Sequence, residues 1–481
     1  MTSTTVTPGR PLPGWLKTGL LAALVFALCW GGAIAWWQSA DTEPGAGDLV
    51  LMLLALPCGL LLVFKLGKKF VLSRPVAPAA AAATRPAPGG AAPAAPAPPL
   101  AILAAALRSP HGTSVDELAA AIAENKARPD LDPELVDDDG FPIMSARSMD
   151  AVDEAVQEEV SEWLELNGMA QLRFSDAQWR ALILGTAIAR DLAAHAVSEL
   201  IPTEGSAPGM QLLPVLPTGW TDEQCRAVGM WFRHAVSQSG WPTANIVPVD
   251  LPAARGKTPR SANVGHFFGQ FALDSRAGDG RLAALVIACD SHIDQETVDH
   301  LAANGSLFTP TRAHGLVPGE GAAGLLLTSL HGARLIDGAV FAQLHPMLEA
   351  RREAPLDDVR RADTKLVAEL SERVARAAGL ELSKVAAIAA DTDHRANRGL
   401  ELMGLASSAL PQLDGTLDVA RVGVALGTCG AVPFITALAL ARHRALDANA
   451  AALFVSNDDP LACCMALACP PTPAPAPTRA A

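Results

Sequence analysis

The sequence predicts an internally duplicated α/β fold that follows two membrane-spanning helices. Two long runs without charged residues stand near the N-terminus, at residues 18–37 and 49–64. Further along the chain, continuous apolar strands alternate with helices, and this alternation then starts again in shorter form. Such strands, separated by helices, favour a mainly parallel sheet that is covered on both faces. We therefore expect two α/β halves, at residues 100–335 and 336–469.

The first apolar run is long enough to cross a bilayer. A helix over residues 18–37 rises about 1.5 Å per residue, which matches a hydrocarbon core of about 30 Å. The second run is shorter, but Lys65 can extend it because its aliphatic stem lets the ammonium group reach the interface. A cleaved signal peptide is the alternative, yet no A-x-A-like site follows closely and a second apolar run comes soon after. Residues 1–74 are therefore predicted to form a two-helix membrane anchor.

Charges beside the two spans predict their orientation. Basic residues precede the first span and follow the second, whereas the connecting loop carries only acidic ones (Arg10 and Lys17; Lys65, Lys68, Lys69 and Arg74; Asp41, Glu43 and Asp48). Positive charge is concentrated on the cytoplasmic side of membrane proteins. We therefore expect a two-pass protein of a bacterial-type inner membrane, with both termini and the folded domain in the cytoplasm.

Two segments of low complexity flank the folded part. Residues 75–99 consist almost wholly of Pro and Ala, a composition that cannot build a core and favours an extended, semi-stiff spacer. Residues 470–481 have the same composition and are predicted to be a disordered tail. The folded unit is therefore expected between residues 100 and 469.

The bulk composition excludes several classes of partner and cofactor. The net charge is −13, whereas nucleic-acid binding requires clustered Lys and Arg. The eight cysteines include no CxxC pair, so neither a zinc site nor a disulfide framework is indicated. We expect no nucleic acid, no metal and no cofactor. The partners that we expect are the lipid bilayer and proteins of a membrane-associated complex.

Apolar runs and capping signals place the secondary structure of the folded unit. Ser114 and Glu117 form a capping-box pattern for a helix that ends at Ile122, and Gly379 follows a helix as its C-terminal cap. Asp139 and Gly140 are typical of a hairpin turn. The expected strands are 100–107, 212–216, 246–249, 282–288, 322–328, 339–344, 385–390 and 453–456, and the expected helical regions include 149–200, 222–238, 365–378 and 431–444.

Several segments, in the same order and at similar spacing, resemble motifs of one enzyme family. The run Gly423-Val-Ala-Leu-Gly-Thr-Cys-Gly-Ala-Val432 precedes a long Ala/Leu helix, and His314-Gly-Leu-Val-Pro-Gly-Glu-Gly-Ala-Ala323 forms a Gly-rich turn. The opening segment 105–122 and the strand Ala283–Ser291 fit the same scheme. Together they resemble the β-ketoacyl synthases of the thiolase-like superfamily. The resemblance implies a duplicated α/β/α/β/α fold and a homodimer.

The residues that a condensing enzyme needs do not stand at the matching positions. Such an enzyme uses a thiolate at a helix N-terminus and two basic groups that promote decarboxylation. The resemblance places the nucleophile at Val264 and the two bases at Asp391 and Val424. The Gly-rich lid of the family is replaced by Asp458-Asp459-Pro460. Because all four elements depart together, we expect a degenerate site with no catalytic residues.

Three other residues are fallback candidates for an unorthodox site. His266 lies two positions from the expected nucleophile, although a helix-start histidine bonded to backbone is the simpler interpretation. His394 follows Asp391 and Asp393 and suggests a metal site, but three such residues in one loop often occur by chance. Cys429 precedes a helix, a position that can lower the pKa of a thiol, but it also fits as a packed small residue.

Two further polar groups receive structural interpretations. Glu320, in the Gly-rich turn, is expected to bond backbone amides and to hold the two halves together. The run Cys289-Asp290-Ser291 offers a carboxylate and a hydroxyl group but no paired histidine, so hydrolase chemistry is not supported.

Two functions remain. The first is a membrane-anchored, cytoplasm-facing pseudoenzyme that serves as a binding or scaffold component of a membrane-associated assembly. The alternative is an acyltransferase-type enzyme that handles acyl-CoA or acyl-carrier substrates with a non-standard site. Convergence of His266, His394 and Cys429 on one pocket favours the enzyme, whereas a pocket filled by Val264 and Val424 favours the scaffold.

Overall fold

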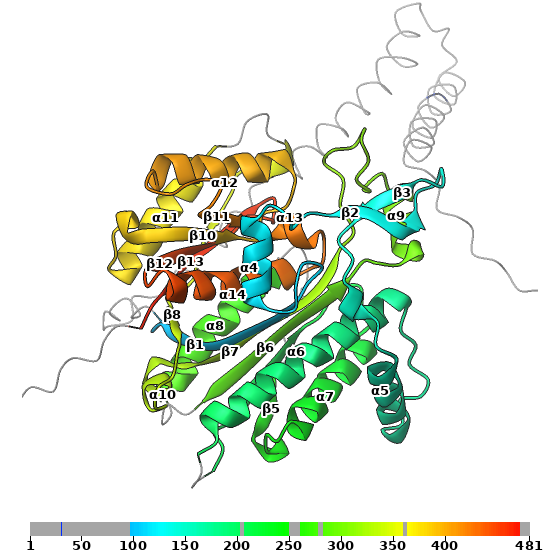
Figure 1. Cartoon of the computed structure of the whole chain (residues 1–481), viewed down its shortest axis with the longest axis horizontal. Helices are drawn as coiled ribbons and strands as arrows, with labels where there is room; N and C mark the ends of the chain where they lie inside the picture. Colours follow the sequence, from blue (N-terminus) through cyan, green and yellow to red (C-terminus); the bar gives the residue numbers. More distant parts are fainter. Residues whose placement is uncertain are drawn as a thin grey trace, which may run out of the picture. The chain divides into compact units, whose positions relative to one another are not determined.

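A computed structural model of the chain describes residues 97–202, 206–249, 260–277, 282–358 and 363–471, together with Trp30 (Figure 1). The chain divides into two compact units, Met1–Ala94 and Ala95–Ala481, and all the described strands belong to the second. Apart from Trp30, the two predicted membrane spans lie outside the described residues, as do most of the predicted linker and tail.

Five strands of the N-terminal half form one part of a large mixed sheet. They are β1 (Leu100–Arg108), β4 (Met210–Val215), β5 (Ile246–Pro248), β6 (Ala283–Ser291) and β7 (Glu320–Ser329). Across the sheet they run in the order β5-β4-β6-β7-β1. Counted along the chain, the order is therefore third, second, fourth, fifth, first.

The C-terminal half repeats this topology. Its strands are β8 (Ala342–Leu344), β10 (Val385–Ala390), β11 (Val419–Arg421), β12 (Ala451–Ser456) and β13 (Ala462–Cys469). Their order across the sheet is β11-β10-β12-β13-β8, again third, second, fourth, fifth, first, and an additional strand, β9 (Leu348–Arg351), pairs with β13. The first strands of the two halves, β1 and β8, pair antiparallel and join the halves into one sheet. The strand order therefore shows the internal duplication directly.

The expectation of a mainly parallel sheet is wrong. Parallel pairing is confined to β4 with β5 and β6, and to β10 with β11 and β12. In each half the last two strands, β6–β7 and β12–β13, are antiparallel. The last strand of each half also pairs antiparallel with the first strand of that half, β7 with β1 and β13 with β8. Between β12 and β13 only residues 457–461 intervene, which is too short for the crossover that a parallel pair needs.

Six helices cover the sheet in three layers. The outer layers consist of α6 (Asp176–Leu200) with α7 (Asp222–Gln238), and of α11 (Lys365–Ala378) with α12 (Ala396–Ala409). The central layer consists of α8 (Arg260–Ala277) and α14 (Val432–Asp447), which pack against strands of both halves. Figure 1 shows these layers in succession from α6 and α7 at the lower right to α11 and α12 at the upper left.

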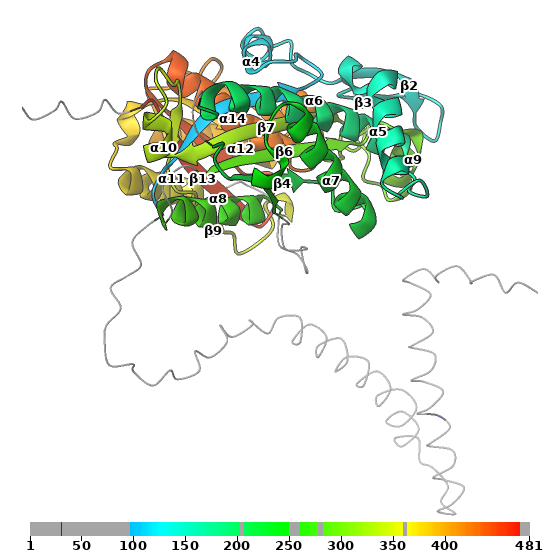
Figure 2. The ribbon, with the colours of Figure 1, turned by 90° about the horizontal axis from the view of Figure 1, so that it is seen from below.

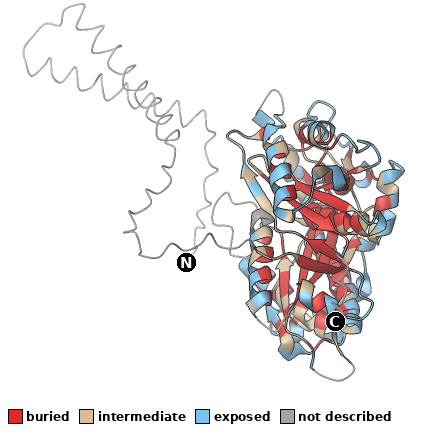
Figure 3. Cartoon of the chain, turned by 90° about the vertical axis from the view of Figure 1, so that its left-hand side faces the viewer, coloured by how far each residue is buried: buried red, intermediate tan, exposed pale blue. Residues whose placement is uncertain are grey.

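Burial on both faces explains the apolar strands. In β6, the side chains Ala284, Val286 and Ala288 join the central core, while the alternate residues Leu285 and Ile287 pack against α6. Alternating side chains of a strand point to opposite faces, so a strand covered on both sides must be apolar throughout. Figure 3 shows the buried strands in the interior and the exposed surface on the outer helices.

Two helices show how local sequence fixes the layers. In α11 the buried residues Val367, Leu370 and Val374 lie on one stripe, and Gly379 ends the helix with a φ of +67°. Among the described helices, only α6 is long and apolar enough to cross a membrane, and 61% of its apolar window is buried inside the protein. It is therefore a core helix of this fold.

The remaining helices, strands and turns complete the unit. They are α4 (Val115–Ala123), β2 (Asp130–Val136), β3 (Pro142–Ser145), α5 (Glu154–Leu166), α9 (Gln295–Ala303), α10 (Leu330–Arg334) and α13 (Val422–Leu426), with 3₁₀ turns at Met149–Ala151, Thr243–Asn245, Leu356–Asp358 and Leu382–Lys384. The predicted turn at Asp139-Gly140 joins the hairpin β2–β3. Figure 2 shows β2, β3, α5 and α9 at one end of the unit, opposite α10 and α11.

Candidate functional site

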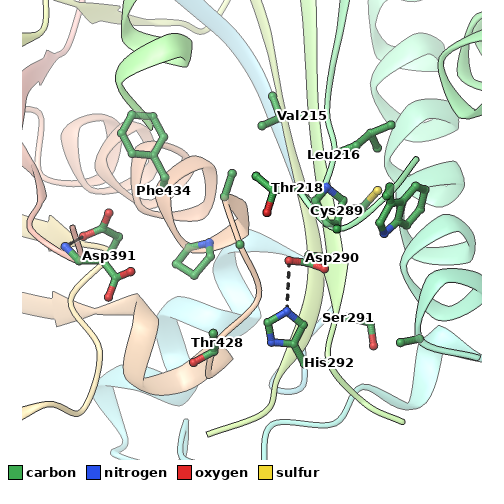
Figure 4. A pocket seen from close by; sticks show the side chains of 18 of the residues that line it. Val215, Leu216, Thr218, Cys289, Asp290, Ser291, His292, Asp391, Thr428 and Phe434 are labelled. Carbon is green, nitrogen blue, oxygen red and sulfur yellow. Dashed lines mark hydrogen bonds and ion pairs between the residues drawn. The ribbon is translucent and has the colours of Figure 1, made fainter. Parts of the chain in front are cut away.

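A cleft of about 610 Å³ lies between the two halves, where strands of both halves end. Residues that follow β4 and β6 form one wall, and residues that follow β10 and β12, with the turn before α14, form the other. In α/β sheets, ligands bind at the carboxyl ends of strands, so the fold places a candidate site here. We call this pocket the central cleft (Figure 4).

The wall from the N-terminal half carries a carboxylate and an imidazole. Asp290 ends β6 and is almost fully buried, and His292 follows it with its Nε2 atom 3.8 Å from Asp290 Oδ2. Figure 4 shows this pair on the opposite side of the view from Asp391. Gly430, before α14, has a φ of +58°, and a Cβ there would lie 2.4 Å from Asp290 Oδ2. Glycine is therefore required where the two walls meet.

Asp391 forms the centre of the opposite wall. Its Oδ2 accepts a hydrogen bond from Ser456 Oγ (2.5 Å), and its Oδ1 accepts bonds from the backbone N–H groups of Asn457 (2.9 Å) and Asp458 (3.3 Å). Burial, and next the negative charge of Asp458, raise the pKa of Asp391 to about 7 in spite of these bonds. The carboxyl group therefore ties the segment after β12 to the end of β10.

Two arginines fill the space beside Asp391. Arg395 donates from Nη2 to Asp458 Oδ1 at 2.7 Å and also bonds Asp393. Arg398 is fully buried; it bonds the Asp357 carboxylate and donates from Nε and Nη2 to the Asp458 carbonyl oxygen, at 2.9 and 2.6 Å. These contacts neutralise both guanidinium groups and fix the segment that replaces the family's lid.

The positions that the family resemblance assigned to catalysis do not form one site. Val264 is fully buried in the central core, on α8. Asp391 lines the central cleft, whereas Val424 lines a second pocket of about 670 Å³. The three positions are therefore occupied by a valine packed in the core, a valine that lines the second pocket and a hydrogen-bonded carboxyl group.

The three fallback candidates also lie apart. His266 is exposed on α8, His394 lines the second pocket, and Cys429 is buried and belongs to neither lining. Burial raises the pKa of the Cys429 thiol well above its usual value, and the charges of Asp290 and Glu320 add to this effect. A thiol in such surroundings is a poor nucleophile. Hence no described pocket collects these three groups.

The metal alternative does not match the geometry either. Asp391 bonds Ser456 and backbone amides, Asp393 bonds Arg395, and His394 lines the other pocket. Within the described residues, no group of three or more His, Cys, Asp or Glu side chains is arranged to hold a metal ion.

The interpretation of Glu320 is confirmed in one respect and wrong in another. The fully buried carboxylate accepts the Ser148 backbone N–H at 2.7 Å, two bonds from Arg180 (2.6 and 2.8 Å) and the Ser291 hydroxyl at 2.9 Å. All these partners belong to the N-terminal half, so Glu320 braces that half alone. The adjacent turn links the halves instead, because Thr428 N–H donates to the Val317 carbonyl at 2.8 Å.

Sequence reasoning missed His292 and the two arginines of the central cleft. His292 directly follows the run Cys289-Asp290-Ser291, but the hydroxyl of Ser291 is engaged by Glu320 and does not face His292 as a nucleophile would. Arg395 and Arg398 follow Asp391 at short spacing on the turn into α12. The spacing of these two arginines, three residues apart and close after Asp391 and Asp393, was the sequence signal that could have indicated ion pairs at this site.

Solved structures with the same fold are ketosynthases. A ketosynthase from module 6 of the bacillaene synthase of Bacillus subtilis 168 matches with a TM-score of 0.52 and 13% identity. The match covers 78% of this chain and 73% of the ketosynthase chain. A ketosynthase from module 1 of the bacillaene synthase of Bacillus amyloliquefaciens FZB42 covers 80% of this chain and 74% of its own, with a TM-score of 0.51 and 12% identity. An oxazolomycin ketosynthase domain of Streptomyces albus JA3453 covers 78% and 76%, with a TM-score of 0.51 and 14% identity.

Similarity of this kind defines the fold. No protein-family model and no curated protein matches the sequence. The resemblance seen in the sequence is nevertheless confirmed at the level of structure: the chain has the thiolase-like fold of ketosynthases.

Proposed function

We propose that this chain is a membrane-anchored, cytoplasm-facing protein that uses a ketosynthase-like fold for binding and does not condense acyl groups. The observation that carries the proposal is the state of Asp391. At the position that the resemblance assigns to a catalytic base, this buried carboxyl group is held by Ser456 and two backbone amides. A group engaged in this way organises a segment of the protein and is not poised as a base toward a substrate.

The nucleophile position supports the same proposal. Condensation needs a thiolate that a helix N-terminus and nearby cations stabilise. The side chain of Val264 packs in the core, and neighbouring Phe267, Phe268 and Phe271 extend the apolar cluster along α8. Cys429 lies within the segment of residues 423–432 that resembles a family motif, and its raised pKa opposes thiolate formation at neutral pH.

The replaced lid is a third support. In a working pocket this segment must admit and enclose a substrate. Here the Asp458 carbonyl oxygen and carboxylate are bonded by Arg398 and Arg395, and the Asp459 carbonyl accepts from Arg352 Nη1 at 2.9 Å. These bonds fix a segment whose movement an acyl-transfer cycle would require.

The membrane part of the proposal rests on the sequence. Two uncharged runs and the distribution of Lys and Arg favour a two-pass anchor with the folded unit in the cytoplasm, and the Pro/Ala-rich stretch serves as a spacer. In this arrangement, protein partners in a membrane-associated complex would be bound by the surface of the folded unit. A homodimer is compatible with the same arrangement.

Covalent labelling tests the inactive site. The full-length protein, solubilised in mild detergent, is incubated with a radiolabelled acyl-CoA and with the same acyl group on an acyl carrier protein, and protein-bound label is measured. We expect no label above that of a heat-denatured sample. Stable labelling of the parent protein that disappears in Cys429→Ala would establish the acyltransferase alternative and overturn the proposal.

Fractionation tests the anchor. Full-length protein should remain in the membrane pellet after carbonate washing, and a variant that lacks residues 1–74 should move to the supernatant. A green fluorescent protein fused to the C-terminus should fluoresce, because that terminus is proposed to be cytoplasmic. Retention of the shortened variant in the pellet, or a dark fusion that is translocated, would contradict this part of the proposal.

A further inference from the structure

The second pocket, of about 670 Å³, has a composition that differs from that of the central cleft. We propose that it binds an anionic amphiphile, a molecule with a carboxylate or phosphate head and a short apolar tail. Its walls come from both halves of the fold: the end of α4 and the following turn, β3, the segment before β7, the turn after β10, and α12 to α13. We call it the side pocket.

The body of the side pocket is apolar. Its lining includes Ile122, Met144, Phe308, Val317, Met403, Val419 and Val424. The volume falls in the range of about 300–1,000 Å³ that is usual for small-molecule sites. A flexible hydrocarbon tail fits such walls because methionine side chains adapt to irregular shapes. Removal of the tail from water would supply much of the binding energy.

The charged groups of the side pocket all have one sign. Arg128 and Arg421 line it, and no Asp or Glu does. His394 also lines the pocket, but burial lowers its pKa and so disfavours its charged form. This is unexpected in a chain with 50 acidic and 37 basic residues. The central cleft, in contrast, is lined by four carboxylates, Asp290, Asp391, Asp458 and Asp459, in addition to its two arginines.

The two arginines of the side pocket have free hydrogen-bond donors. Arg128 donates from Nε to Asn125 Oδ1 at 3.1 Å, which leaves its terminal nitrogens available. Among the described residues, neither Arg128 nor Arg421 takes part in an ion pair of the kind that engages Arg395 and Arg398. Both side chains are on exposed residues, so they can turn toward a head group without breaking a bond to a carboxylate.

His394 supplies a third polar group, deeper in the pocket. Its Nε2 atom is buried and has no hydrogen-bond partner among the described residues. The ring forms a hydrogen bond with the Gly315 backbone. It also makes a T-shaped contact with the ring of Phe308, with the two centroids 5.3 Å apart. A buried ring nitrogen without a partner is costly. Burial lowers the pKa of His394, so its neutral ring would accept a hydrogen bond at Nε2 from a protonated oxygen of a ligand head group.

These observations favour an anionic amphiphile over other ligands. A cation would meet the positive charges of Arg128 and Arg421, and a neutral hydrocarbon would leave the Nε2 atom of His394 unsatisfied. A polar anion without a tail would leave the apolar walls in contact with water. The side pocket also differs from the central cleft in its lining, so the proposal does not depend on the absence of condensing activity.

Equilibrium binding tests the proposal with the full-length protein in nanodiscs of neutral phosphatidylcholine. The probes are radiolabelled decanoate and decyl phosphate, with decanol and decyltrimethylammonium as uncharged and cationic controls, and empty nanodiscs correct for partition into lipid. We expect saturable binding of at least one anionic probe and binding at least about tenfold weaker for both controls, as expected for a charge-assisted contact. Preference for the carboxylate would indicate a fatty acid and preference for the phosphate a lysolipid.

Variants locate the binding. Arg421→Gln and His394→Gln should each weaken binding of the preferred anionic probe about five- to tenfold, and Thr416→Trp should abolish it by filling the entrance at an exposed lining residue. Arg334→Gln, an exposed arginine on α10 outside the lining, is the matched control and should leave affinity unchanged. Absence of saturable binding, equal binding of decanol, or full binding by the Thr416→Trp variant would overturn the proposal.

Discussion

The two halves of the folded unit share a strand order but stabilise the ends of their strands in different ways. At the start of β7 in the N-terminal half, the buried carboxylate of Glu320 is matched by one arginine and by neutral donors. In the C-terminal half, several carboxylates and two arginines share a network around Asp391 and Asp458. The backbone topology is therefore duplicated, while the polar interior is not.

This difference shows where the fold has room to change. Strand order depends on which residues are apolar on both faces, and both halves keep that pattern. The segments that follow β10 and β12 carry no such constraint, and there Asp391 and the run Asp458-Asp459-Pro460 stand where the resemblance places one base and the lid. Activity resides in such segments, so a fold can persist when its chemistry is lost.

Replacing Glu320 should have the largest effect on stability. Glu320→Gln leaves the Arg180 guanidinium without a counter-charge in a buried site, and we expect a loss of about 3–5 kcal/mol in the free energy of unfolding. Denaturant titration measures it. Glu159→Gln, which removes the half-exposed pair with Arg190, is the control and should cost less than about 1 kcal/mol. Equal losses in the two variants would show that burial of the Glu320 pair is unimportant.

The contact between the halves should be nearly as sensitive. In Gly319→Ala, the new Cβ would lie 1.9 Å from the Leu426 carbonyl oxygen, so the turn before β7 and the turn before α14 must separate. We expect a loss of about 2–3 kcal/mol in the free energy of unfolding. Gly219→Ala, which meets no atom within 4 Å, should change stability by less than about 0.5 kcal/mol. A tolerated Gly319→Ala would mean that the halves are not in close contact there.

Two buried aspartates should respond to pH in opposite directions. Burial, and then the Asp458 charge, raise the pKa of Asp391 to about 7, so the native state retains a proton that the unfolded chain releases near pH 4. Stability from this group is complete below about pH 4 and is lost as pH rises to about 7. Asp391→Asn should therefore gain at least about 1 kcal/mol over the parent at pH 8 and nothing at pH 4.

Asp132, in the N-terminal half, provides the contrast. Burial acts to raise its pKa, but hydrogen bonds from Arg147 and Ser145 outweigh burial and lower the pKa to about 2. Its contribution is present above about pH 4 and is lost as pH falls toward 2. Asp132→Asn should thus be destabilised at neutral pH. Urea midpoints measured from pH 2 to pH 8 test both variants, because the response of Asp132 falls below pH 4 and that of Asp391 above it. A parallel pH response of the two variants would contradict the assigned environments.

The smallest effect is expected at His266. The residue is exposed on α8 and faces no described pocket, so His266→Ala should change the free energy of unfolding by less than about 0.5 kcal/mol. Thermal unfolding measures it, with the parent protein as reference. A large loss would reveal contacts that the exposure of this histidine does not indicate.

Much of the fold could be predicted because it depends on local patterns. The strand Val385–Ala390 and the helix Lys365–Ala378 match the expected ranges, since continuous apolar runs and a terminal glycine define them. The short strands β9 and β11 were missed, because three or four residues with partly exposed side chains carry no clear periodicity. The antiparallel pairing of β6 with β7 depends on contacts between segments that residues 292–319 separate. The short connection of residues 457–461 between β12 and β13, in contrast, does indicate antiparallel pairing.

The candidate site could be predicted only in part. Position in the chain located Asp391 at the end of its strand, but it could not show that Ser456 and Asn457, more than sixty residues later, would bind this carboxyl group. Nor could it separate Val424 from Asp391, which line different pockets. Hydrogen bonds between segments far apart in the chain determine which polar side chains have partners, and such bonds cannot be predicted from the local pattern of a single sequence.

Decarboxylation of a malonyl thioester tests the central claim most directly. The full-length protein is mixed with malonyl groups labelled at the free carboxyl carbon and carried on an acyl carrier protein, and released labelled carbon dioxide is measured. With a packed valine and a hydrogen-bonded carboxyl group at the positions that the resemblance assigns to the nucleophile and to a base, we expect release no faster than in buffer. Release well above that rate, abolished by Asp391→Asn or Cys429→Ala, would contradict the claim.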